Sequence, residues 1–169
     1  MGFADLMLSV PQILIVVFLQ AIFGKSGYLS LALSIGVTGW MAMARIIRNE
    51  VRRIRETDYV TAARMMGGSF GYILRKHLLP GFLPAVLYAA VSSIGAAMMT
   101  EATLSFMGLG LPVAEVSWGG LLSDSRNALL SDSWWIILIP GIVLIGTLIA
   151  IAALGEQVRK GNTRLHSNL

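Results

Sequence analysis

Four apolar runs, each close to the length of a membrane helix, divide this 169-residue chain. They cover residues 6–23, 29–47, 82–107 and 134–154. A helix needs roughly 20 mainly apolar residues to cross a hydrocarbon core about 30 Å thick. An isolated strand would leave its backbone N–H and C=O groups unpaired in lipid, so each run must be helical. The sequence therefore predicts an all-α integral membrane protein with four membrane helices in a single transmembrane domain, residues 1–169.

Composition supports a membrane protein and argues against other classes. Hydrophobic residues make up 56% of the chain, charged residues make up 13%, and the mean hydropathy is +0.74, which is too apolar for an ordinary soluble domain. The formal net charge is +4, and in such a chain a basic excess belongs to cytoplasmic loops rather than to a nucleic-acid site. The sequence has no cysteine, which excludes disulfides, zinc–thiolate sites and thiol catalysis. We expect a lipid bilayer around the protein and no nucleic-acid partner.

The distribution of basic residues predicts the orientation, because loops rich in Lys and Arg stay cytoplasmic. Basic residues cluster near and between the second and third runs: Arg45, Arg48, Arg52, Arg53, Arg55, Arg64, Arg75 and Lys76. The tail after the fourth run carries Arg159, Lys160 and Arg164. We therefore expect the loop 48–80 and both termini on the cytoplasmic side of the membrane.

The loop 48–80 contains the capping and helix-ending residues expected for two short helices. Thr57 or Asp58 can cap the first helix, and Gly67-Gly68 can end it in a left-handed turn. Ser69 can cap the second helix, and Pro80 is expected to stop it. The sequence therefore predicts an ordered cytoplasmic segment rather than a passive connector.

The first of these short helices carries a narrow apolar stripe. Residues spaced i, i+3, i+4 and i+7 share one face of a helix, and here they are Tyr59, Ala62, Ala63 and Met66. Thr61 and Arg64 are expected to point away from this face. Spacing alone leaves two interpretations open. The stripe packs beneath the chain's own membrane helices, or its small side chains let a partner approach, with Tyr59 and Met66 filling pockets.

A longer pattern in the same segment resembles a known family. Thr61-Ala62-Ala63 is followed after three residues by Gly67 and after nine more by His77, one residue and Leu79-Pro80. This spacing resembles the EAA motif of the membrane subunits of binding-protein-dependent ABC importers. Thr61 stands where that motif has Glu, and His77 stands where it has Ile. His in that position resembles the peptide and nickel branch of the family.

A second block resembles the same branch. The stretch EATLSFMGLG, residues 101–110, followed by Ser117-Trp118-Gly119, is similar to the segment after the fifth membrane helix of dipeptide, oligopeptide and nickel permeases. Those permeases typically have six membrane helices. The resemblance implies that this chain begins just before the third and is a fragment or a shortened subunit.

The resemblance implies a fold, partners and a role. The fold would be the type I importer (MetI-like) permease core, in the plasma membrane, with a cytoplasmic coupling helix. The partners would be a second permease subunit in a heterodimer, two cytosolic ATPase subunits that carry out ATP hydrolysis, and an extracytoplasmic binding protein. The solute would be a peptide or a nickel or other metal chelate. The implied ATPase-coupling residues are Asp58, Tyr59, Thr61, Ala62, Ala63, Arg64, Met66, Gly67, Leu79 and Pro80.

Three polar residues of the third run are candidates for the transport pathway. Glu101 is an ionisable residue in an otherwise apolar segment, and such residues mark functional sites by default. Interfacial positioning or pairing between helices is the alternative. Ser92 and Ser93 give the same run a small polar face, which suits either a pathway wall or close helix packing.

An intramembrane enzyme and a membrane scaffold are the alternatives to a transport function. An intramembrane enzyme needs a nucleophile beside a base, or clustered ligands, at bilayer depth. The four runs contain no His and no paired carboxylates, so we expect no catalytic residue, no metal site and no bound cofactor. A non-transporting membrane scaffold is the other alternative, and it gains weight if the chain functions without the additional helices of the family.

Overall fold

The computed structural model describes residues 9–24, 27–112, 114–125 and 133–166, with side chains described up to residue 160. Within these ranges the chain is helical and contains no strand. The elements are α2 (Gln12–Phe23), α3 (Tyr28–Arg55), α4 (Asp58–Met65), α5 (Phe70–Ile73), the π-helical turn η1 (Leu74–Leu78), α6 (Leu79–Phe106), α7 (Trp118–Asp124) and α8 (Trp135–His166).

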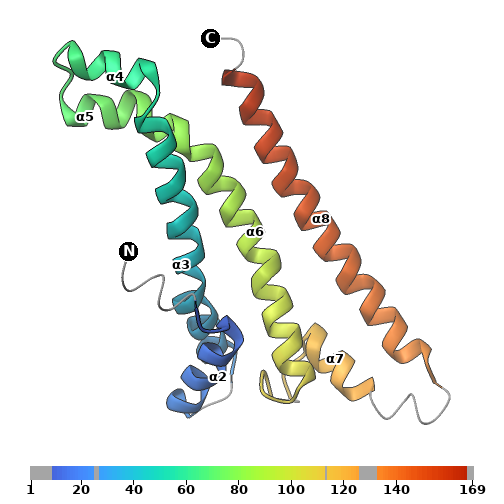
Figure 1. Ribbon diagram of the computed structural model, residues 1–169. Coiled ribbons are helices and arrows are strands. Elements are labelled where there is room, and N and C mark those ends of the chain that lie inside the picture. The colour runs from blue at the N-terminus through green and yellow to red at the C-terminus, as the bar shows by residue number, and fades with distance from the viewer. Residues whose placement is uncertain (1–8, 25–26, 113, 126–132, 167–169) are drawn as a thin grey trace.

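Three helical segments of the described chain are long and apolar enough to cross a membrane. They are Tyr28–Arg55, Phe70–Phe106 and Trp135–Lys160. The central helix α6 packs against α3 on one side and α8 on the other, and α7 packs against its far end (Figure 1). Most large apolar side chains stay exposed, as Phe18 and Ile149 illustrate at 64% and 63%. A surface of this kind suits lipid, and the all-α membrane class predicted from the sequence is confirmed.

The first predicted span, 6–23, is represented by the shorter helix α2, and residues 6–8 lie outside the described part of the chain. The 12 residues of α2 extend over about 18 Å, less than a hydrocarbon core of about 30 Å. α2 packs on the first half of α3, where Val16, Leu31 and Leu104 form a buried cluster. At its start, the Gln12 amide donates to Thr38 Oγ1 at 3.1 Å.

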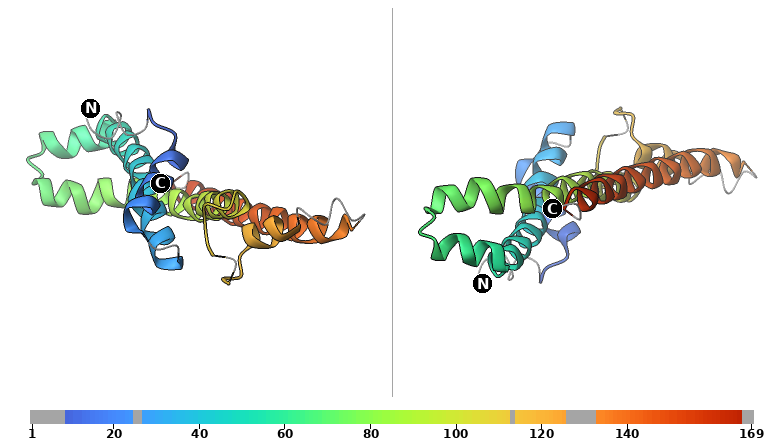
Figure 2. Two further views of the ribbon diagram at one scale, coloured as in Figure 1. Left: turned by 90° about the horizontal axis from the view of Figure 1, so that it is seen from below. Right: turned by 90° about the horizontal axis from the view of Figure 1, so that it is seen from above.

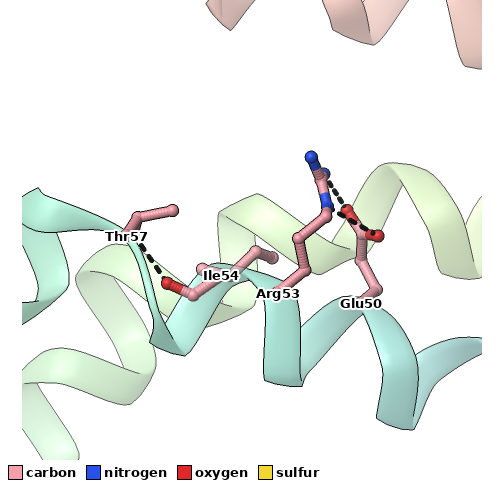
Figure 3. A network of polar contacts seen from close by, with 4 residues as sticks. All are labelled: Glu50, Arg53, Ile54 and Thr57. Atoms are coloured by element: carbon pink, nitrogen blue, oxygen red, sulfur yellow. Dashed lines mark hydrogen bonds and ion pairs between the residues drawn. The ribbon is translucent and has the colours of Figure 1, made fainter.

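The helix that contains the second predicted span continues beyond Ile47, because α3 ends only at Arg55. Its 28 residues extend over about 42 Å, so two to three turns project beyond a hydrocarbon core of about 30 Å. Arg52, Arg53 and Arg55 occupy the last turn, where cations favour the negative end of the helix dipole. Arg53 forms an ion pair with Glu50 on the same helix (Figure 3).

The prediction that Pro80 stops the second short helix is wrong. α5, η1 and α6 follow one another without a break, so the helix runs from Phe70 to Phe106. Proline has no N–H to donate and its ring clashes with the carbonyl four residues earlier in a regular α-helix. Here Pro80 stands in the first turn of α6, directly after the wider π-helical turn. A π-helical turn changes which carbonyls need a donor, so the proline is accommodated.

Candidate functional site

α4 and α5 form a helical hairpin that projects from one end of the long helices (Figures 1 and 2). In both views of Figure 2 the two helices lie side by side, away from the bundle axis. The hairpin is attached to the membrane helices by a buried apolar cluster, made of Ile54 on α3, Val60 and Ala63 on α4, Ile73 on α5 and Leu78 on η1. The cluster therefore connects α4 to the end of α3 and to the start of the Phe70–Phe106 helix.

Gly67 makes the turn between α4 and α5 possible. Its φ is +79°, a left-handed conformation in which glycine has no Cβ penalty. The Gly67 N–H donates to the Arg64 carbonyl at 3.1 Å, and the Gly68 N–H donates to the Ala63 carbonyl at 3.0 Å. These two bonds are those of a Schellman motif at a helix C-terminus. The predicted left-handed turn at Gly67-Gly68 is thus confirmed.

The predicted side-chain cap is present at the start of α5 and absent at the start of α4. Ser69 Oγ accepts from the Tyr72 N–H at 3.3 Å, so the predicted cap of the second helix is confirmed. Thr57 is the N-cap residue of α4, but neither it nor Asp58 makes the predicted side-chain cap. Instead the Thr57 hydroxyl donates to the Ile54 carbonyl at 2.6 Å, at the end of α3 (Figure 3). The short link to α3 lets Thr57 satisfy that carbonyl.

The predicted stripe on α4 is divided between two surfaces, which corrects the expectation of a single face. Ala63 is buried together with Val60, a residue outside the predicted stripe. Tyr59 and Ala62 are exposed, and Met66 is 81% exposed. The two interpretations of the stripe therefore each describe one part of it: Val60 and Ala63 pack inward, while the remaining face is uncovered.

The uncovered surface extends beyond the predicted residues, and we call it the hairpin face. It is formed by exposed side chains of α4, the turn and α5: Tyr59, Ala62, Met65, Met66, Phe70 and Tyr72. Met65 and Phe70 are 84% and 76% exposed. Methionine adapts to irregular pockets and aromatic residues supply large contact area. The helical period of the sequence does not identify Met65 and Phe70 as part of this surface, because their placement depends on the geometry of the turn.

The remaining predicted coupling residues lie at different distances along the chain from this face. Thr61 is exposed, and its hydroxyl donates to the Thr57 carbonyl at 3.1 Å. Arg64 is also exposed, in the last turn of α4. Leu79 and Pro80 lie in the first turn of α6, after η1. The motif thus spans both ends of the hairpin rather than one helix surface.

His77 joins the two arms of the hairpin, a role that sequence reasoning missed. Its ring lies 5.8 Å from that of Tyr59 on α4 and 5.8 Å from that of Tyr72 on α5. The Lys76 ammonium lies 5.3 Å from the centre of the Tyr72 ring. Aromatic pairs at such separations are favourable beyond their buried area. The His at the motif's Ile position therefore packs as an aromatic residue.

The second sequence block builds the opposite end of α6. The Ser105 hydroxyl donates to Glu101 Oε1 at 2.8 Å and accepts from the Leu111 N–H at 3.0 Å. Gly108 has φ +79°, and it ends α6 with bonds from the Gly108 and Leu109 N–H groups. α7 approaches closely at Gly119, because a Cβ there would lie 2.4 Å from the Ala102 carbonyl oxygen. The block thus specifies a tight α6–α7 junction.

Glu101 is brought to a cavity at this junction, whereas the two serines are not. The cavity has a volume of about 620 Å³ and lies between α3, α6, residues Leu111, Val116 and Ser117, and α7. Its walls are mainly apolar and include Tyr28, Trp118 and Glu101. Ser92 and Ser93 lie exposed on α6, and the Ser93 hydroxyl donates to the Ala89 carbonyl at 2.7 Å. No group of three or more His, Cys, Asp or Glu side chains with metal-binding geometry occurs among the described residues.

Comparison of the sequence with known proteins identifies relatives of this chain. Residues 1–160 match the family described as binding-protein-dependent transport system inner membrane component. The dipeptide transport system permease protein DppC of Bacillus subtilis is 33% identical over 159 residues, covering 94% of this chain and 49% of that protein.

Two further relatives show the same extent of similarity. The oligopeptide transport system permease protein OppC of Bacillus subtilis is 32% identical, covering 94% of this chain and 52% of the relative. A putative peptide transport system permease protein of Brucella suis is 35% identical over 156 residues, covering 92% of this chain and 52% of the relative. The chain spans about half the length of these curated relatives.

Proposed function

We propose that this chain is a permease subunit of a peptide ABC importer and that it docks on cytosolic ATPases through its hairpin face. The chain belongs to the family of binding-protein-dependent transport system inner membrane components. The observation that carries the proposal is the hairpin itself. It exposes methionine and aromatic side chains, and its buried side chains pack against two membrane helices.

Two features of the hairpin support a role in coupling. Its exposed face offers apolar side chains for a groove in a partner, and Arg64, also exposed on α4, could meet acidic groups there. Its inner face packs on Ile54 of α3 and Leu78 of η1. Closure of two nucleotide-bound ATPases would displace the hairpin and, with it, both helices. A nucleotide bound to another chain would thereby bias a two-state element in the membrane.

The proposed partners follow from the family. They are a second permease subunit in a heterodimer, two cytosolic ATPases, and an extracytoplasmic binding protein that delivers the solute. The protein would lie in the plasma membrane with the hairpin and both termini in the cytoplasm. ATP hydrolysis would occur in the ATPases and not in this chain.

Peptides are the solute class that we propose, because the relatives are named as dipeptide, oligopeptide and peptide permeases. Nickel and other metal chelates form the second class to test. The cavity beside Glu101 is the proposed part of the pathway, since it combines apolar walls with one carboxylate. Ser92 and Ser93 would line the pathway only where α6 meets a further subunit.

Co-expression with candidate ATPases tests the docking. Ala62→Arg places a charge at an exposed position of the hairpin face, so it should abolish copurification of the ATPases and their stimulation by loaded binding protein. Asn49→Arg, an equal change of charge at an exposed position of α3, should leave both unchanged. If Ala62→Arg and Asn49→Arg behave alike, the hairpin face is not the docking site.

A further inference from the structure

The last two turns of α3 carry a second charged surface, on the side opposite the Glu50–Arg53 ion pair. This exposed side borders an open space of about 720 Å³ and is formed by residues of α3 alone: Ala44, Ile47, Arg48, Val51, Arg52 and Arg55. We call it the arginine groove. It lies on α3 and is separate from the hairpin face.

The three arginines of this groove have no partner within the described part of the chain. Arg48, Arg52 and Arg55 are exposed, and no hydrogen bond or ion pair is formed to them among the described residues. No carboxylate lines the groove, and the nearby Glu50 is already paired with Arg53. Three guanidinium groups spaced i, i+4 and i+7 therefore present a concentrated positive charge along one side of the helix.

The position of the groove along α3 places it at a membrane surface. The apolar run of α3 ends near Ile47, so Arg48 lies at the edge of the hydrocarbon core. With a rise of about 1.5 Å per residue, Arg52 lies about 6 Å and Arg55 about 10 Å farther out. The headgroup layer on each side of a bilayer is about 5–8 Å thick. Arg48 and Arg52 therefore lie at the level of the lipid phosphates.

The apolar lining of the groove complements this charge. Ala44 and Ile47 lie on the hydrocarbon side of Arg48, and Val51 lies beside it, so acyl chain and phosphate can contact adjacent parts of one surface. Guanidinium groups bind phosphate oxygens in bidentate geometry. Basic clusters next to a membrane helix attract anionic lipids. We propose that the arginine groove binds anionic phospholipid of the leaflet that it faces.

Lipid binding is measured on the full chain, reconstituted with phosphatidylcholine and a minor share of phosphatidylglycerol and then purified. Mass spectrometry of the retained lipid gives the enrichment of phosphatidylglycerol over its bulk share. The wild-type chain should be enriched. Arg48→Gln/Arg52→Gln/Arg55→Gln should lower the enrichment by at least about fivefold, because each such arginine contributes about that factor at an anionic surface.

A charge-matched control separates the groove from net charge. Arg53→Gln/Arg75→Gln/Lys76→Gln removes the same charge from other exposed positions and should lower the enrichment less than the groove variant does. The single substitution Arg48→Gln, which changes the chain least, should also reduce the enrichment of phosphatidylglycerol measurably.

Three results would overturn the proposal. The wild-type chain could show no preference for phosphatidylglycerol, or both triple variants could lose it equally. The groove variant could instead keep the lipid and lose copurification of the ATPases, in which case the groove contacts protein.

Discussion

Three glycines lie in or directly after the turn between α4 and α5, in three different environments, so one substitution can be compared at neighbouring sites. Gly67 has φ +79° and open space around the position of a Cβ. Gly71 also has open space, but its backbone lies in the helix α5. At Gly68 a Cβ would lie 2.7 Å from the Ala63 carbonyl oxygen. Alanine therefore tests backbone strain at Gly67, helix propensity at Gly71 and steric overlap at Gly68.

These environments give an ordered series of local stabilities. Gly67→Ala should destabilise the hairpin by about 1–2 kcal/mol, the cost of a left-handed conformation for an L-residue. Gly71→Ala should stabilise it by up to about 1 kcal/mol, because alanine is the better helix former. Gly68→Ala should cost more than Gly67→Ala, because relieving the overlap breaks the bond from the Gly68 N–H to the Ala63 carbonyl, and the strained turn opens.

Hydrogen exchange of the amides in 57–73, followed by mass spectrometry on the detergent-solubilised chain, measures this local opening. A loss of 1–2 kcal/mol corresponds to roughly 5–30-fold faster exchange when opening is a rapid equilibrium. Gly67→Ala should show this acceleration and Gly71→Ala should show equal or slower exchange than the wild type. Equal protection in Gly67→Ala and Gly71→Ala would refute the account of the turn.

Three further substitutions test the packing beneath the two candidate sites. Val60→Ala removes methyl groups from the buried cluster and should cost about 1–3 kcal/mol, seen as faster exchange of α4 amides; unchanged exchange would contradict the cluster. Gly119→Ala should lower the thermal midpoint by separating α7 from α6, while Gly141→Ala, which has open space, should not; equal midpoints would contradict the close approach. Ser105→Ala should cost about 1–3 kcal/mol by leaving the Leu111 N–H without its acceptor, and a midpoint equal to wild type would contradict that role.

The sequence predicted most of what depends on local chemistry. The apolar runs located the long helices, because length and polarity decide what a bilayer accepts. Gly67 and Ser69 were identified from residue type, because a left-handed turn and an N-cap each depend on a few neighbouring atoms.

Features that depend on neighbouring elements were predicted less well. Pro80 was expected to end a helix, but the preceding π-helical turn accommodates it. The stripe on α4 was assigned to one face, although Val60 and Ala63 are buried by contacts with α3 and η1. Helical periodicity identifies which residues share a side of a helix, but not which side a second helix covers.

The second sequence block, at the far end of α6, was identified from its residue pattern alone. The structure shows which contacts its residues make. Ser105 connects Glu101 to the Leu111 backbone, and Gly119 permits the close contact of α7 with α6. Neither role follows from spacing, since both depend on how the chain turns back after Gly108.

Single-cysteine cross-linking tests the proposed docking most directly, because the chain contains no native cysteine. Cysteines at Tyr59, Ala62 and Met66 place a thiol on the exposed side of the hairpin, and cysteines at Val60 and Ala63 place it in the buried cluster. With co-expressed ATPase subunits and a short bifunctional reagent, the first set should form cross-links to the ATPase and the second should not. Cross-links absent from the first set, or equally strong from both sets, would contradict docking through the hairpin face.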